Sequence, residues 1–222
     1  MVRRRLEETL RREGLPLEER ILLSLGVLVV LGRFEEFERL LPLAARERVP
    51  LERVRETLLE THLFAGIPRT IEAFERLGSV VATGVFADAS PPLPERKGPT
   101  GPRGVALFRR IYAGQADAVR LRLASHHPDL ERWILEHAYG RVLGRPALNP
   151  RLRELFGVAF LVALRAWRQL PSHLRGAIRC GASTAEVLEA IRQTAAHVPS
   201  AAAARAERLL GPFVRPAGRK AR

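Results

Sequence analysis

The sequence predicts an all-α protein that contains two similar helical repeats. Apolar residues recur at helical spacing, and no segment shows the apolar–polar alternation of a half-buried strand. A constant offset of 133 residues aligns positions 12–61 with 145–194 without a gap, and thirteen of the fifty pairs are identical. These identities fall mainly on the apolar ridges. We therefore expect an internal duplication, with a segment of different character between the two copies.

The first copy is expected to cover residues 1–78, with helices near 17–31, 34–47 and 51–64. The turn Gly66-Ile67-Pro68 follows, and a further helix at about 69–77 closes the copy. Residues 79–104 are rich in Pro and Gly towards their end and read as an exposed linker. These signals place the end of the first repeat near residue 78.

A helical insert is expected at 105–145, made of two amphipathic segments, VALFRRIYAGQADAVRLRLA and HPDLERWILEHAYGRVLG. His126-His127 before Pro128 reads as the entry to the second helix. The apolar face of that helix is expected to carry residues at helical spacing, namely Leu130, Trp133, Ile134, His137 and Arg141. We expect Trp133 and Tyr139 to be core residues, and His62 and His137 to be packing residues.

The second copy is expected at 146–211, and its helix boundaries are marked by capping residues. Asn149-Pro150 opens an apolar helix that runs to about Leu164, and a second helix at 170–179 ends before Gly181. Ser183-Thr184-Ala185-Glu186 is a capping box that opens a third helix, and 201–210 is the closing helix. The basic tail, 212–222, is expected to be disordered.

Composition narrows the function classes. The formal charge of +13 invites a nucleic-acid partner, but arginine alternates with glutamate along most of the chain, which is typical of a solvated, salt-bridged surface. The longest apolar run, 21–32, is about a dozen residues, well short of the roughly 20 that span a bilayer. The single cysteine, Cys180, excludes an internal disulfide and a four-thiolate metal site. We expect a soluble, cytoplasmic protein.

ILEHAYGRVLGRPALNPRLRELFGVAFLVAL followed by QLPSHLRGAIRCGASTAEVLEAI resembles a carboxymuconolactone decarboxylase unit of the alkyl hydroperoxidase D-like superfamily. RVRETLLETHLFAGIPRTIEAF in the first copy resembles the same unit. The resemblance implies two repeats of that helical fold. It also implies a homo-oligomer, because two-repeat relatives tend to form trimers with a pseudo-sixfold arrangement of repeats.

The chain departs from the thiol-dependent members of this superfamily. Ala166 and Gln169 stand where those members carry a Cys-x-x-Cys pair, so thiol peroxidase activity is disfavoured. Arg168 replaces their intervening relay histidine. The two copies also differ from each other: the first keeps the AGIP turn but has Leu40 at the histidine position, whereas the second keeps His173 and lacks the turn. One composite site is therefore expected.

The resemblance implies that His173 and Glu154 are catalytic, with no metal and no cofactor required. An imidazole suits proton transfer near neutral pH, and we expect its ring within about 4 Å of the Glu154 carboxylate. Arginine binds carboxylates in a fork, so the candidates for binding a small anionic substrate are Arg175, Arg153 and Arg145, with Arg151 as an equal alternative.

Three function classes remain open at this point. The first is a cofactor-free lyase or isomerase acting on a small carboxylated lactone or keto acid. The second is a non-catalytic small-acid-binding or scaffold protein of the same fold. The third and least favoured is a basic nucleic-acid binder. Cys180 lies seven residues from His173 on a helix, about 10 Å along the axis, so a thiol–imidazole couple between them is not expected.

Overall fold

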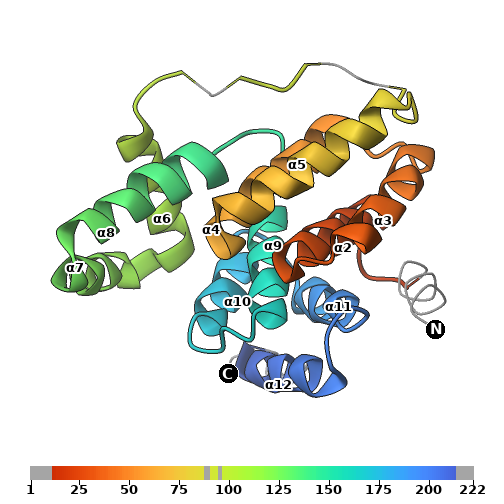
Figure 1. Ribbon diagram of the computed structural model, residues 1–222. Helices are drawn as coiled ribbons and strands as arrows, with labels where there is room; N and C mark the ends of the chain where they lie inside the picture. Colours follow the sequence, from red (N-terminus) through yellow and green to blue (C-terminus); the bar gives the residue numbers. More distant parts are fainter. Residues whose placement is uncertain (1–11, 88–90, 95–96, 214–222) are drawn as a thin grey trace.

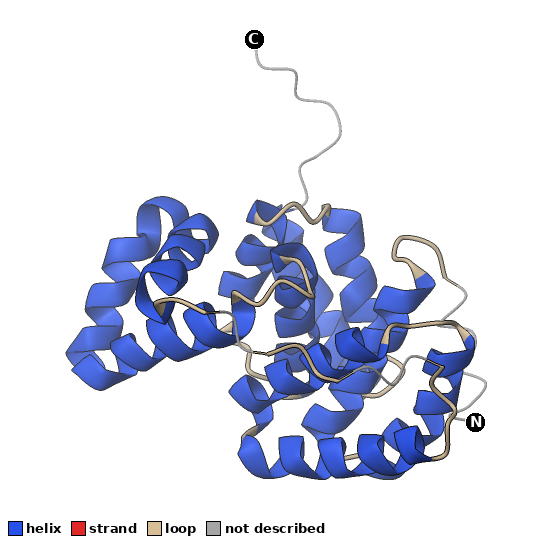
Figure 2. Cartoon of the chain, turned by 90° about the horizontal axis from the view of Figure 1, so that it is seen from above, coloured by secondary structure: helices blue, strands red, loops and turns tan. Residues whose placement is uncertain are grey.

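A computed structural model describes residues 12–87, 91–94 and 97–213. These residues form helices joined by turns and loops, with no strand among them, which confirms the all-α class (Figure 2). The α-helices of the first copy and the insert are α2 (Leu17–Leu31), α3 (Phe34–Arg46), α4 (Leu51–Ala65), α5 (Ile67–Ala82), α6 (Thr100–Tyr112), α7 (Ala116–His126) and α8 (Pro128–Trp133). Those of the second copy are α9 (Pro150–Ala163), α10 (Leu170–Arg179), α11 (Thr184–Thr194) and α12 (Ser200–Leu210). Two 3₁₀ turns, η1 (Ala113–Gln115) and η3 (Gly211–Phe213), and a π-helix, η2 (Ile134–Leu143), complete the described elements.

The offset of 133 residues relates three of the four helix starts in the two copies, while α10 begins at 170, three residues later than the offset from α3 predicts. Helices α2, α4 and α5 begin at residues 17, 51 and 67, and α9, α11 and α12 begin at 150, 184 and 200. The expected caps are present in the second copy. The Asn149 side chain accepts a hydrogen bond from the Leu152 backbone N–H at 2.9 Å, and Ser183 and Glu186 form the capping box of α11.

The same offset relates the turns that end the first two helices of each set. Gly32 and Arg165 both have positive φ, 71° and 56°, and so do Arg48 and Gly181, 56° and 105°. In each case the backbone N–H groups at and after the left-handed residue return to carbonyls of the preceding helix turn. Arginine occupies the strained conformation once in each set, so the backbone geometry is preserved where the glycine is not.

Helices α2 and α9 form the centre of the molecule, with α4 and α5 above them and α10, α11 and α12 below in Figure 1. Residues 19–30 of α2 and 152–163 of α9 are buried without interruption. A helix that is buried on all sides belongs in a core, which explains the continuous apolar runs in both segments. The polar exceptions within these runs are Glu19, Arg20, Ser24, Arg153 and Glu154.

The insert forms a separate lobe beside this bundle in both views (Figures 1 and 2). Helix α6 begins at Thr100, inside the segment predicted as linker, and packs closely on η2. A Cβ atom on Gly104 would overlap the Leu135 carbonyl, and one on Gly140 would overlap that of Thr100. These glycines therefore allow the two backbones to touch, and Gly104 belongs to the lobe instead of to a linker.

The insert differs from the expected pair of helices in two respects. Ala113 has φ 49° and divides the first segment into α6 and α7. The second segment becomes a π-helix after Trp133, and its buried face carries Leu135, Tyr139 and Leu143. A π-helix has more residues per turn, so the α-helical spacing predicted the wrong face. Trp133 is 62% exposed, which contradicts its expected place in the core.

At the ends of the described segments, helix α5 continues to Ala82, a turn beyond the predicted limit of the first repeat. The tail expected to be disordered lies outside the described residues from 214 onwards. Within the described part of the chain, no helix combines the length and the apolar content needed to cross a membrane.

Candidate active site

His173 and Glu154 lie together where α9 and α10 pack against each other. The Nδ1 atom of His173 is 3.0 Å from Oε2 of Glu154, within the separation expected from the sequence. The Glu154 side chain is 2% exposed and that of His173 is 18% exposed. An ionised carboxylate only accepts hydrogen bonds, so Nδ1 donates and Nε2 is the nitrogen that can exchange a proton with a substrate.

Two glycines make room for this pair. A Cβ atom on Gly157 would lie 2.5 Å from Nδ1 of His173, and one on Gly176 would overlap Oε2 of Glu154. Each glycine sits on the helix opposite the side chain that it accommodates, Gly157 on α9 and Gly176 on α10. The contact therefore depends on the absence of side chains at both positions.

The first copy contributes a wall of the site within the same chain. The Phe64 ring lies 5.9 Å from that of His173, centroid to centroid, and 5.2 Å from that of Phe160. Phe64 precedes the AGIP turn, in which Gly66 has φ 81° and ψ 166° and joins α4 to α5. This backbone conformation is open only to glycine, which explains the residue at that position. The first copy thus contributes Phe64, the residue two before Gly66, to the surroundings of His173.

The insert lobe closes the other side of Glu154. The hydroxyl of Tyr139 donates to that of Tyr112 at 3.4 Å, and both rings pack on Phe108. Burial raises the pKa of Tyr112 and raises that of Tyr139 well above its ordinary value, and the neighbouring Glu154 charge acts in the same direction. Both phenols therefore keep their protons at neutral pH and remain hydrogen-bond donors.

Cys180 lies in the same apolar cluster as Tyr139 and is 6% exposed. Burial, together with the Glu154 charge, raises the pKa of its thiol to about 11. The thiolate is the reactive form of cysteine, so this residue is chemically quiet near neutral pH. The chain has no second cysteine to pair with it.

Two of the three arginines predicted to bind substrate are engaged in buried ion pairs. Arg145 Nε lies 2.6 Å from Glu56 Oε1, and Arg153 lies 2.7 Å from Glu56 Oε2 and 3.0 Å from Glu60 Oε2. Arg175 is exposed, lies over the Phe213 ring at 5.8 Å, and forms no ion pair among the described residues. Of the three, Arg175 alone has a guanidinium that a substrate can reach without displacing a glutamate.

Arg151, the equal alternative, is also engaged in ion pairs. Its guanidinium contacts Glu186 at 2.7 Å and also contacts Glu19. Arg168, at the relay-histidine position, is exposed. A surface hollow lies away from the pair, between α3 and α5, and is lined by Glu35, Glu38, Arg39, Pro42, Val80, Thr83 and Val85. None of the predicted site residues lines this hollow.

Sequence reasoning missed Glu60, which belongs to the same region. Its side chain is completely buried, and Oε1 has no hydrogen-bond partner among the described residues. Burial raises the pKa of Glu60 to about 8 against the opposing effect of Arg153, and the charges of Glu154 and Glu56 add to the rise. The one available signal was an acid four residues after Glu56, on the same face of the helix.

His62 and His137 were expected to be packing residues, and they contact each other instead. Their Nε2 atoms are 2.7 Å apart, across the junction of α4 and η2, and His137 is exposed. No group of three or more candidate ligands for a metal ion occurs among the described residues. The pair therefore links the first copy to the insert at the surface.

The sequence was compared with known proteins. Residues 128–210, which span α8 to α12, match the carboxymuconolactone decarboxylase family. The chain is 30% identical over 139 residues to peroxisomal protein 2 of Schizosaccharomyces pombe, covering 62% of this chain and 65% of that protein. It is 36% identical over 64 residues to nitrosuccinic acid decarboxylase npaB of Metarhizium robertsii, covering 29% of this chain and 45% of that protein. The chain thus spans less than two thirds of the length of either relative.

The family match contains both Glu154 and His173, together with the glycines that accommodate them. It also contains the capped helices α9 and α11 and the buried π-helix that carries Tyr139. The all-α architecture agrees with the helical fold that the resemblance implied. Residues 128–210 of this chain thus belong to the carboxymuconolactone decarboxylase family.

Proposed function

We propose that this protein is a cofactor-free decarboxylase that acts on a small anionic acid, with His173 as the proton-transfer residue. The observation that carries the proposal is the 3.0 Å contact between His173 and Glu154. The glutamate side chain is buried, whereas the histidine side chain is partly exposed. A carboxylate that fixes one ring nitrogen orients the other towards a reacting group, which is a recurrent arrangement for general acid–base catalysis. The family match and the decarboxylase relative support the same reaction type.

The proposed chemistry needs a substrate that can hold the electron pair left by CO₂. The carbon–carbon bond to the carboxylate breaks, CO₂ leaves, and the pair is delocalised into a neighbouring lactone, keto or nitro group. His173 Nε2–H then donates a proton to the carbon, and the ring regains one from solvent. Glu154 stabilises the imidazolium whenever it forms, because its charge lies beside Nδ1.

Arg175 is the proposed substrate-binding residue. Two residues after His173, it faces a different side of α10, but its charge acts on Tyr112 at the edge of the site. A planar guanidinium binds a second substrate carboxylate in a bidentate manner. Arg145 and Arg153 are assigned a structural role instead, because their guanidinium groups form ion pairs with Glu56 and Glu60.

Two alternatives define what the experiment has to separate. A non-catalytic small-acid-binding or scaffold protein would keep the fold and Arg175 but would show no turnover. A basic nucleic-acid binder is less favoured, because arginine–glutamate pairs cover much of the surface. Arg76, for example, contacts Glu35, Glu38 and Glu72. We propose the cytoplasm as its compartment, which fits one buried, unpaired thiol.

The test is CO₂ release from carboxylated lactones, β-keto acids and nitrosuccinate by wild-type protein and by His173→Gln. We expect turnover of one of these classes and a loss of roughly a hundredfold or more in kcat in the variant, as for removal of a general acid. His126→Gln is the matched control, since His126 is exposed on α7 and away from the site. Equal activity of wild type and His173→Gln would overturn the proposal, and ligand binding without turnover would favour the scaffold alternative.

A further inference from the structure

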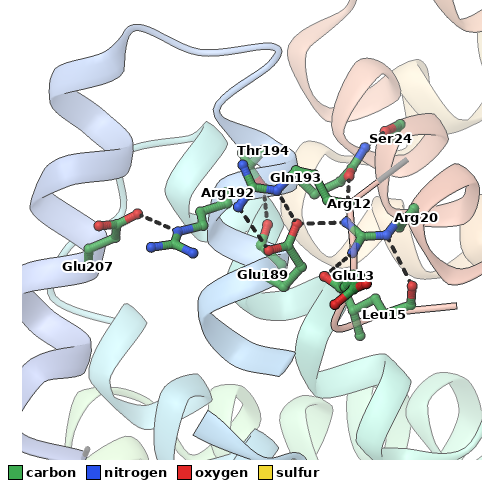
Figure 3. Close-up of polar contacts among 11 residues, drawn as sticks. Arg12, Glu13, Leu15, Arg20, Ser24, Glu189, Arg192, Gln193, Thr194 and Glu207 are labelled. Atoms are coloured by element: carbon green, nitrogen blue, oxygen red, sulfur yellow. Dashed lines mark hydrogen bonds and ion pairs between the residues drawn. The ribbon is translucent and has the colours of Figure 1, made fainter. Parts of the chain in front are cut away.

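The duplication provides an internal control for deciding which buried polar residues serve a site. Each half sends an arginine from its first helix into the third helix of the other half. Arg153 of α9 binds Glu56 of α4 at 2.7 Å, and Arg20 of α2 binds Glu189 of α11 at 2.6 Å. The second contact and its surroundings are seen in Figure 3. The two clusters are related by the offset of 133 residues.

Most polar members of the two clusters are the same residue type. Arg145 supports Glu56 at 2.6 Å, and its counterpart Arg12 supports Glu189 at 2.7 Å (Figure 3). Thr61 and Thr194, one residue after the second glutamate or glutamine position, are also identical and fully or almost fully buried. These residues occur in both clusters, so they are sufficiently explained by the joining of the two halves.

Three of the positions that differ carry a titratable residue in the set that includes Arg153 and none in the set that includes Arg20. Glu60 binds Arg153 and Glu154 binds His173, whereas the residues at the offset of 133 are Gln193, Ile21 and Leu40. Gln193 satisfies its position without a charge, because its Oε1 accepts from Arg20 at 3.3 Å and its Nε2 donates to Ser24 at 2.8 Å (Figure 3). Joining the halves therefore does not require an acid at the position of Glu60.

Charge balance gives the acid at position 60 a specific consequence. Two guanidinium groups, those of Arg145 and Arg153, pair with Glu56 and Glu60, while a third buried carboxyl, Glu154, pairs with His173 and acts on Glu60 through its charge, so three buried carboxyl groups share two permanent cations. Glu56 accepts from both arginines, while Glu60 receives one arm of Arg153 and keeps Oε1 without a partner among the described residues. A buried cluster with one carboxyl in excess retains a proton instead of an uncompensated charge.

We propose that Glu60 is a positioning residue of the active site, whose buried carboxyl retains this proton and thereby sets the charge that the cluster presents to His173 through Glu154. This inference rests on the proposed function for its catalytic meaning. It makes the site a product of both halves, since Glu60 comes from α4 and the Glu154–His173 pair from α9 and α10. In the described structure Glu60 lies outside the part of the chain that matches the family.

The electrostatics around Glu60 agree with this role. The charged groups that act on it are Arg153, Glu154 and Glu56, and burial outweighs the arginine, so that its pKa rises to about 8. The titratable groups of the insert and the C-terminal end of α10 that the Glu154 charge affects are Tyr112, Tyr139 and Cys180, and all three are protonated at neutral pH. Glu60 is thus neutral at pH 7 and gains its charge as the pH passes about 8. That charge favours the protonated form of a nearby imidazole.

The first test needs no substrate. Histidine rings are labelled with ¹³C, the His173 signal is assigned by its absence in His173→Gln, and its shift is followed from pH 5 to pH 10. We expect a step near pH 8 in wild type that is absent in Glu60→Gln, a variant that copies the amide of Gln193. Glu60→Asp keeps a carboxyl and is expected to retain a step. Gln193→Glu adds an acid at the equivalent place and should leave the His173 curve unchanged.

The second test is the pH profile of turnover. Because Glu60 is already neutral at pH 7, we expect Glu60→Gln to change kcat and KM little at that pH and to lose the limb near pH 8, whereas Glu60→Asp retains it. Identical His173 titrations in wild type and Glu60→Gln would overturn the inference, whatever the activity. Full turnover by His173→Gln combined with a lost step in Glu60→Gln would instead reject His173 as the proton-transfer residue and leave the coupling intact.

Discussion

His197 shows how a single buried side chain can set the acid stability of this fold. It is 8% exposed, and neither ring nitrogen has a hydrogen-bond partner among the described residues. Burial, aided by the charge of Arg33, lowers its pKa from 6.5 to about 4. Between these values the unfolded chain binds a proton and the folded protein does not. Stability is therefore present above pH 6.5 and is lost as the pH falls towards 4.

We predict that His197→Phe reduces this loss. The substitution introduces the residue found at the equivalent position 64 and removes the titrating group. The slope that His197 contributes is at most about 1.4 kcal/mol per pH unit inside the window. Urea unfolding of both proteins between pH 4 and pH 8 measures it as the difference between two curves. A difference that stays constant over this range would contradict the assignment.

Residue-level prediction succeeded where the residue type is tied to a motif. His173 and Glu154 were predicted from their places in the family pattern, and their contact is present. Arg145 and Arg153 were placed near the site but assigned to substrate. Glu56, which binds both arginines, lies 89 and 97 residues away from them in the sequence, and no local sequence pattern indicates so distant a partner. Glu60 was missed for the same reason.

At the scale of helices, the α9–α10 contact makes a sharp prediction. Gly176→Ala should preserve the helix, because alanine is the better helix former, but its Cβ would displace the Glu154 carboxylate from His173. We expect at least a tenfold loss of kcat with the melting temperature nearly unchanged. Gly78→Ala in α5 is the matched control. Nothing lies within 4 Å of its Cβ position, so it should keep full activity and gain up to about 1 kcal/mol. Equal activity of the two variants would show that the pair tolerates displacement.

The starts of helices in the second copy were predictable because individual capping residues mark them. Asn149, Pro150 and the capping box at Ser183 mark starts that the structure reproduces. The π-helix was not predictable, because it packs against α6 through Gly104 and Gly140, a tertiary contact that the spacing of apolar residues does not report. The spacing of apolar residues predicts the buried face of a regular α-helix, and on that basis Trp133 was assigned to the core. In the structure the helix becomes a π-helix after Trp133, and this side chain is exposed to solvent.

At the scale of the whole molecule, we predict a homo-oligomer and most specifically a trimer. Apolar side chains remain exposed on α5 and the insert, including Ile67 at 56%, Ile71 at 52%, Leu121 at 74% and Trp133 at 62%. Such residues are candidates for contacts between chains. Light scattering at micromolar concentration should give about three times the chain mass of 24.8 kDa. A mass of 24.8 kDa would contradict the prediction, and Ile71→Glu would be expected to weaken assembly.

The crossed arginines have a consequence for how the two halves can change over time. Arg20 and Arg153 each neutralise a glutamate that belongs to the other half. Replacing the arginine of one half would therefore leave a buried glutamate of the other half without its partner, at a cost of several kcal/mol. The halves are bound to one another like the subunits of an obligate heterodimer that happens to share a backbone. Because the two halves stay together, the first half can carry Leu40 and Ile21 at the positions of the histidine and the glutamate, while the second half keeps His173 and Glu154.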